Sequence, residues 1–270
     1  MSTGAGVSTM IGFSVRWAVP FIFLVVAISS VQILFPGPFP MWLLRNRKYI
    51  GMCFAVAMAW QGLFIFIMSN FFREYYFADV YFFRDELEGS IGYIFLPAMV
   101  VTSFEFGRKH LSSKQWKLLH KSGIYFLWAY PFSTYWWSLC NGLSCYNNPV
   151  PLDYVYYSLG FLAFALRIAA WGKQRQQATK RNAPESSTPL AFKVLGGAVI
   201  AFGLFVSASG LHWQEPVFAF LTAPKWSANL ELWLPFWPFR PYFSLFIIGR
   251  GAMLVTKAVP KVEGLRTIET

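Results

Sequence analysis

The sequence predicts an all-α integral membrane protein, built as a bundle of six or seven helices. Of its 270 residues, 56% are hydrophobic and 20% are aromatic, whereas only 13% are charged. A soluble domain carries about a quarter charged residues, so this composition is typical of a membrane protein. Long apolar segments recur along the whole chain. We therefore expect one polytopic membrane domain over residues 1–270.

The positions of the helices follow from the apolar segments and from the breaks between them. Crossing the hydrocarbon core takes roughly 20 consecutive apolar residues. Proline-rich breaks lie at "PGPFP" (36–40), "NNPVP" (147–151) and "NAPESSTP" (182–189). The third segment is short and the seventh contains Arg250, which leaves the number of spans at six or seven. The expected helices are 14–35, 50–71, 90–106, 118–138, 154–172, 192–211 and 241–258.

The distribution of charge predicts an orientation. Of the 23 Lys and Arg residues, eighteen lie in every second loop, namely 36–49, 105–121, 167–193 and the tail from 250. The acidic residues show the opposite bias. By the positive-inside rule, the N-terminus is outside and the C-terminus is cytoplasmic. The formal charge of +11 is then explained by the orientation of the chain in the membrane. We therefore expect the lipid bilayer as partner and no nucleic acid. The N-terminus lacks the features of a cleaved signal peptide.

The cysteines and histidines offer little conventional chemistry. The sequence has no CxxC, HExxH or P-loop motif, and no GxSxG motif with partners. Cys53 is interpreted as a packing residue. Cys140 and Cys145 flank an outward loop and form either a disulfide or two free thiols. About 30 Å of hydrocarbon separates His120 from His212, so these two cannot share a metal ion. His110 is expected in an inner loop, in water or among headgroups.

Three stretches carry a resemblance to a known family. "RNRKYIGMCFAVAMAWQG" (45–62) has a basic cluster, then Gly51, then Gln61 ten residues later. "LPAMVVTS" follows at 96–103, and Trp116, Leu119, His120 and Tyr125 complete the pattern. Over roughly residues 20–140 this order resembles the ferric-reductase-like transmembrane family. Within that family it is nearest to the haem-binding membrane subunits of bacterial periplasmic methionine-sulfoxide reductases.

The resemblance implies a membrane haem protein, but two ligand positions differ. The family has haem-ligand histidines at the positions of Gln61 and Ser133. Helices two and four run in the same direction, and both residues lie about 20 Å beyond the basic end, so they flank one site. An amide and a hydroxyl are poor ligands for haem iron. They can hydrogen-bond to each other or to a helix backbone instead. The resemblance thus implies that the deeper bis-His haem is lost.

His120 is the family histidine that remains. It could hold one inner haem b, with Arg47 as a partner or with propionates paired to Arg45, Arg47 or Lys48. Alternatively, His120 caps the inner end of its helix among Lys117 and Lys121. We expect the second arrangement, with no cofactor bound.

The function expected from these observations is non-catalytic. We expect an accessory protein, a subunit of a larger membrane complex, in the bacterial inner membrane. The alternative is an oxidoreductase membrane subunit that transfers electrons through one haem on His120 and takes them from a reductase or a quinone. A transporter is disfavoured because no pair of ionisable residues marks a pathway at the midplane.

Overall fold

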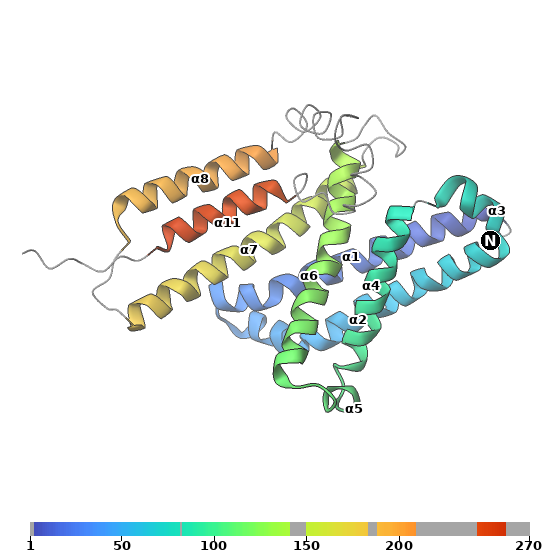
Figure 1. Ribbon diagram of the computed structural model, residues 1–270, viewed down its shortest axis with the longest axis horizontal. Helices are drawn as coiled ribbons and strands as arrows, with labels where there is room; N and C mark the ends of the chain where they lie inside the picture. Colours follow the sequence, from blue (N-terminus) through green and yellow to red (C-terminus); the bar gives the residue numbers. More distant parts are fainter. Residues whose placement is uncertain (1–2, 82, 141–149, 183–187, 209–241, 258–270) are drawn as a thin grey trace, which may run out of the picture. The chain divides into compact units, whose positions relative to one another are not determined.

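The computed structural model describes residues 3–81, 83–140, 150–182, 188–208 and 242–257, and every regular element in these residues is a helix (Figure 1). Three short elements join longer helices: α3 (Arg73–Tyr75), a π-helical turn η1 (Tyr76–Val80) and α5 (Glu105–Arg108). The long helices are α1 (Gly4–Leu34), α2 (Pro38–Phe71), α4 (Phe83–Val101), α6 (Ser113–Cys140), α7 (Pro151–Asn182), α8 (Leu190–Ala208) and α11 (Phe243–Val255).

Each of the seven predicted segments coincides with one of these long helices. Four of them, α1, α2, α7 and α8 as far as Ser207, are long and apolar enough to cross a membrane. The 13 residues of α11 rise only about 20 Å, less than the hydrocarbon thickness. An α-helical membrane protein is therefore supported, while the number of crossings stays a prediction.

The helix ends differ from the predicted ones because helices continue beyond their apolar segments. α2 begins at Pro38 and not at residue 50, since proline suits the first turn of a helix, where the missing N–H has no partner. α7 runs on through "GKQRQQATKRN" to Asn182, a stretch rich in residues that favour helix. α4 ends at Val101, before residue 106, where Thr102 and Ser103 donate their hydroxyls to carbonyls of the last turn.

The described helices fall into two compact units. The first holds α1 to α6 and the part of α7 up to Phe164; the second holds the rest of α7 with α8 and α11. The prediction of a single membrane domain stays a prediction.

α1 is the central helix of the first unit. It packs along α2 and against α6, while α4 packs against α6 and α2. In its most apolar 18-residue window, 50% of the residues are buried, compared with 17% in that of α2. Buried side chains along α1 include Val7, Val19, Ile22 and Ile28. α1 is thus shielded by protein, and α2 presents much more of its surface to the surroundings.

The α1–α2 pair is longer than a bilayer is thick. With 31 and 34 residues, these helices extend about 46 and 51 Å, whereas the hydrocarbon core measures about 30 Å. In Figure 1 the pair runs obliquely across α4 and α6. Tilt alone rarely absorbs such a mismatch. A crossing by this pair would therefore leave part of it beyond the hydrocarbon.

A stack of aromatic rings joins α6 to α7 within the first unit. The rings of Tyr157, Phe132, Trp128 and Phe164 follow one another at centroid separations of 5.2, 4.9 and 4.9 Å, with interplanar angles of 15° to 21°. Trp128 also donates its Nε1–H to the carbonyl oxygen of Gly160, at 3.0 Å. Phe132 is fully buried. These contacts hold the start of α7 against the middle of α6.

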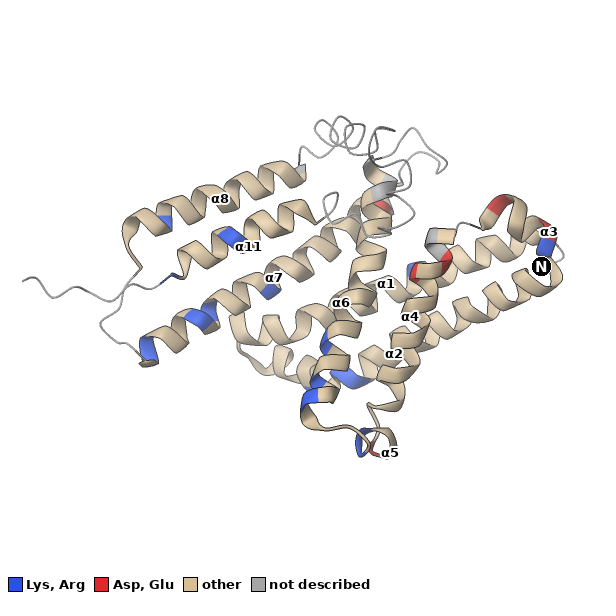
Figure 2. Ribbon diagram, viewed as in Figure 1, with Lys and Arg blue, Asp and Glu red and all other residues tan. Residues whose placement is uncertain are grey.

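Charge is separated between the two ends of the first unit (Figure 2). Lys and Arg gather at the starts of α2 and α6 and around α5, whereas acidic residues mark α3, η1 and the start of α4. This separation follows the loop-by-loop bias in the sequence.

In the second unit, α8 and α11 are in backbone contact at glycines. A Cβ added to Gly196 would lie 2.7 Å from the carbonyl oxygen of Gly251, and one added to Gly251 would lie 2.7 Å from that of Gly196. A Cβ at Gly203 would lie 2.7 Å from the Ile248 side chain. Glycine is required at this crossing because small residues let apolar helices approach closely.

This contact predicts that Gly196→Val destabilises the packing of α8 on α11 by about 1–3 kcal/mol, the usual cost of overpacking. Unfolding of the purified chain by SDS in mixed micelles measures the change. Gly197→Val is the matched control, because no atom lies within 4 Å of a Cβ added to Gly197. Equal destabilisation by the two substitutions would show that helix propensity, and not the contact, is responsible.

Candidate functional site

The start of α6 is fixed by a reciprocal pair of hydrogen bonds. Gln115 N–H donates to Ser112 Oγ (3.3 Å), and the backbone N–H of Ser112 donates to Gln115 Oε1 (2.9 Å). This is a capping box, which satisfies backbone donors that the first helical turn leaves open. In the preceding loop, Arg108 donates to the carbonyl oxygen of Leu111 (2.7 Å) and to Ser113 Oγ (3.3 Å). The loop is thus tied to the helix that carries His120.

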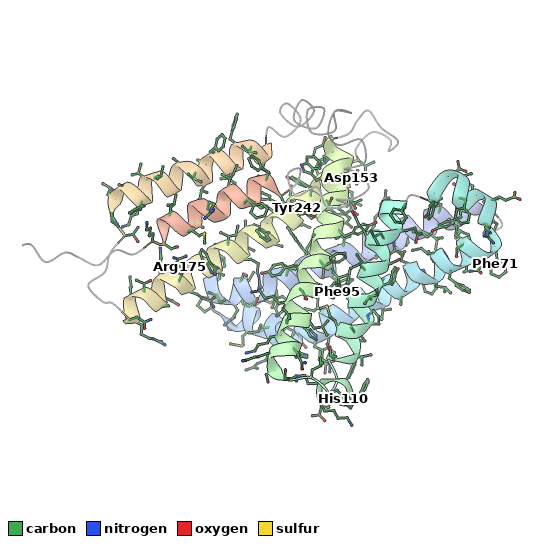
Figure 3. All side chains as sticks on the ribbon, in the orientation of Figure 1. Phe71, Phe95, His110, Asp153, Arg175 and Tyr242 are labelled. Atoms are coloured by element: carbon green, nitrogen blue, oxygen red, sulfur yellow. The ribbon has the colours of Figure 1, made fainter. Side chains whose placement is uncertain are left out.

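α4 and α6 approach closely at Gly123, about one helical turn beyond His120. A Cβ added to Gly123 would clash with Met99 Sδ and lie 3.1 Å from the Phe95 ring. Phe95, labelled in Figure 3, packs against Phe126 with ring centroids 5.6 Å apart. The absence of a side chain at Gly123 therefore lets the end of α4 lie against α6. As a result, Thr102 comes within reach of His120.

His120 is half-buried and held on two sides. Its Nε2 lies 3.0 Å from Thr102 Oγ1, and its ring lies 4.3 Å from the Trp116 ring at an angle of 30°. Trp116 in turn donates its Nε1–H to the carbonyl oxygen of Thr102, at 3.0 Å. Thr102, Arg108, Trp116 and His120 together are called the His120 cluster below.

Thr102 bonds in two directions. Its hydroxyl donates to the carbonyl oxygen of Ala98, at 2.6 Å. Its oxygen also lies within hydrogen-bonding distance of His120 Nε2, and the donor in that pair depends on the tautomer of His120. The imidazole therefore acts as a tie between α6 and the end of α4.

Positive charge surrounds the His120 cluster. The guanidinium groups of Arg47 and Arg108 lie near enough to act electrostatically on His120. Arg108 also lies over the Trp116 ring, 5.3 Å from its centroid. Lys48 Nζ lies 4.0 Å from the centroid of the Phe104 ring. The start of α2 thus contributes two cations to the same end of the unit.

Gln61 lies on α2 and bonds to α4. The Tyr93 hydroxyl reaches the carbonyl oxygen of Met58 at 2.9 Å and Gln61 Oε1 at 3.2 Å. A Cβ added to Gly62 would lie 3.3 Å from the Tyr93 ring, so the two helices are close here. The amide oxygen of the half-buried Gln61 thus has its partner on a neighbouring helix.

Ser133 is half-buried on α6 and lies beside the fully buried Phe132. Within the described residues, no hydrogen bond joins it to Gln61. α2 and α6 are connected chiefly through α1 and α4, which pack on both. Of the two bonding arrangements expected for the lost-ligand pair, a direct bond between the residues does not occur, and Gln61 uses Tyr93 instead.

Nε2 of His120 is engaged by Thr102, and Trp116 covers one face of the ring. Ligation of a haem iron through Nε2 would therefore require the bond to Thr102 to break. Within the described residues, no group of three or more His, Cys, Asp or Glu side chains is placed to hold a metal ion.

The other candidate residues are dispersed or lie outside the described residues. His110 is exposed in the loop that follows α5 (Figure 3). Cys53, expected to be a packing residue, is exposed on α2. Arg250 is exposed on α11. His212, Cys145 and the side chain of Cys140 lie outside the described residues, so the Cys140–Cys145 disulfide stays a prediction.

Three residues of these contacts were not predicted from the sequence to be functional: Tyr93, Thr102 and Arg108. Thr102 belongs to the "LPAMVVTS" stretch that carries the resemblance, and Arg108 is one of the basic residues of 105–121 that predict the orientation. Each therefore had a weak sequence signal of a role. Tyr93 had none beyond being an aromatic residue in an apolar helix.

Compared with protein-family models, curated proteins and solved structures, the chain shows no match in any of the three.

The Tyr93 bond yields a test of the α2–α4 contact. Tyr93→Phe removes the hydroxyl that serves Met58 and Gln61, and it should reduce the free energy of unfolding by about 0.5–1.5 kcal/mol. SDS unfolding in mixed micelles measures the loss. The matched control is Tyr49→Phe on the exposed surface of α2, where no hydroxyl bond is formed with the described residues. If Tyr93→Phe and Tyr49→Phe were equally stable, the bond would contribute nothing.

Proposed function

We propose that this chain is a non-catalytic accessory protein of a bacterial inner membrane, and that it is a subunit of a larger membrane complex. In this proposal it has a ferric-reductase-like fold of six or seven membrane helices, and its former haem-ligand positions serve helix packing. The basic end of the first unit faces the cytoplasm, the N-terminus is outside and the C-terminus is inside, as the positive-inside rule requires.

The observation that carries the proposal is the use of the polar residues at two ligand positions. Gln61 accepts a hydrogen bond from Tyr93, and His120 Nε2 is hydrogen-bonded to Thr102. Tyr93 lies on α4 and Thr102 directly follows it. A polar group among apolar helices costs free energy unless it is bonded, so these residues stabilise the bundle without a cofactor.

A second candidate function is electron transfer through one inner haem b on His120, with electrons from a reductase or a quinone. The charges of Arg47 and Arg108 near His120 favour it, because guanidinium groups pair with haem propionates. This function requires His120 to give up its bond to Thr102 and to offer the Nε2 lone pair. The deeper positions, Gln61 and Ser133, supply no imidazole for a relay across the membrane.

One optical experiment separates the two functions. The full-length chain is expressed in cells supplied with the haem precursor δ-aminolevulinic acid, purified in mild detergent, and scanned as isolated and after reduction with dithionite. The proposal predicts no Soret band and no α-band above the level of a mock purification. A stoichiometric haem spectrum that disappears in His120→Ala would establish the electron-transfer function instead.

Stability distinguishes a packing role of His120 from a ligand role. His120→Asn retains a side-chain donor that can reach towards Thr102, whereas His120→Ala removes it. If His120 serves packing, Ala should cost about 1–2 kcal/mol in SDS unfolding and Asn should cost less. Equal stability of the wild type and both variants would contradict the packing role.

A further inference from the structure

We propose that the basic end of the first unit binds the phosphate headgroup of an anionic phospholipid, between the start of α2 and the loop of residues 102–112. This inference goes beyond the proposed function and does not depend on it, because a haem-containing chain would keep the same surface.

Positive charge is concentrated at this end of the first unit. Residues 36–49 and 105–121 together contain eight Lys and Arg residues and one acidic residue, Glu105. Glu105 is exposed on α5. This excess lies in one place, at the starts of α2 and α6 and around α5 (Figure 2). Positive charge next to a membrane attracts anionic lipid at about 1 kcal/mol per Lys or Arg.

Two of these cations are held in place by uncharged groups. Arg108 is fixed by a carbonyl, a hydroxyl and the face of Trp116, and Lys48 lies over the face of Phe104. Neither residue forms an ion pair with any part of the chain that the structure describes. Both cations are oriented by neutral groups and keep their full charge for an anion. Both are also attached to the same loop, since Phe104 and Arg108 belong to it.

Exposed aromatic side chains indicate the kind of anion. On the same segments as these cations, large aromatic side chains are exposed: Phe39 by 67%, Trp42 by 57% and Tyr49 by 66% on α2, and Phe106 by 59% beside Phe104. The Phe39 and Trp42 rings stack at 6.2 Å, and those of Phe104 and Phe106 at 5.9 Å. Aromatic rings favour the headgroup level of a bilayer. A free phosphate needs no apolar surroundings, whereas a phospholipid brings an acyl chain for these rings to contact.

The test measures lipid binding to the delipidated full-length chain in non-ionic detergent through its unfolding temperature. Dioleoylphosphatidylglycerol should raise this temperature with saturation, whereas dioleoylphosphatidylcholine and inorganic phosphate at the same concentrations should not. The double variant Lys48→Gln/Arg108→Gln should weaken the apparent affinity for phosphatidylglycerol by roughly fivefold per residue, about 25-fold in all. The matched control, Lys180→Gln/Arg181→Gln, removes two exposed cations at the end of α7 and should change the affinity less than twofold.

Several results would overturn the proposal. An equal shift with phosphatidylcholine would show that the headgroup charge is irrelevant, and an equal shift with inorganic phosphate would show an anion site that ignores lipid. Equal weakening by the control variant would show a diffuse effect of net charge. If the double variant fails to fold, two other measurements test the proposal: the affinity of Lys48→Arg and the salt dependence of the wild-type affinity. Lys48→Arg should bind as the wild type does, and the wild-type affinity should fall as NaCl rises from about 50 to about 500 mM. A salt-insensitive affinity would contradict the proposal.

Discussion

A polar side chain inside a bundle of apolar helices has to be hydrogen-bonded, and in the first unit α4 and the residue after it provide the partners. Tyr93 serves Gln61 from α2, and Thr102 serves His120 from α6. An unbonded amide or imidazole among apolar side chains would cost about 1–3 kcal/mol. This constraint orients α2 and α6 relative to α4. It also explains how polar residues persist at positions where the resemblance implies metal ligands.

Particular helices and residue types also account for the apolar packing. α1 is buried as the central helix, and the aromatic stack from Tyr157 to Phe164 holds α7 against α6. Where helices approach closely, glycine occupies the contact. Gly123 faces the side chains of α4 in the first unit, and Gly196 and Gly251 face each other's backbone in the second. Small residues at such points let apolar helices pack closely.

Much of the fold could be predicted because a long apolar segment by itself indicates a membrane helix. Each of the seven apolar segments overlaps a helix of the described residues, from α1 to α11. The helix ends were less accurate, since α2 starts at Pro38 and α7 continues to Asn182 through polar residues that favour helix without being apolar. At the candidate site, His120 and Gln61 were found from motif spacing. Their partners were not, and neither was the lack of a bond between Gln61 and Ser133.

The all-α character, the positions of the helices and the separation of basic from acidic ends could be predicted from the sequence alone. Each of these depends on residue type within a short window. Three contacts emerge only from the packing of the helices: the bond of His120 to Thr102, the bond of Gln61 to Tyr93, and the approach of Lys48 and Arg108 to the same loop. These contacts join residues from different helices. They depend on how each helix is rotated about its axis and how closely glycines let it approach its neighbour, and neither is set by local composition.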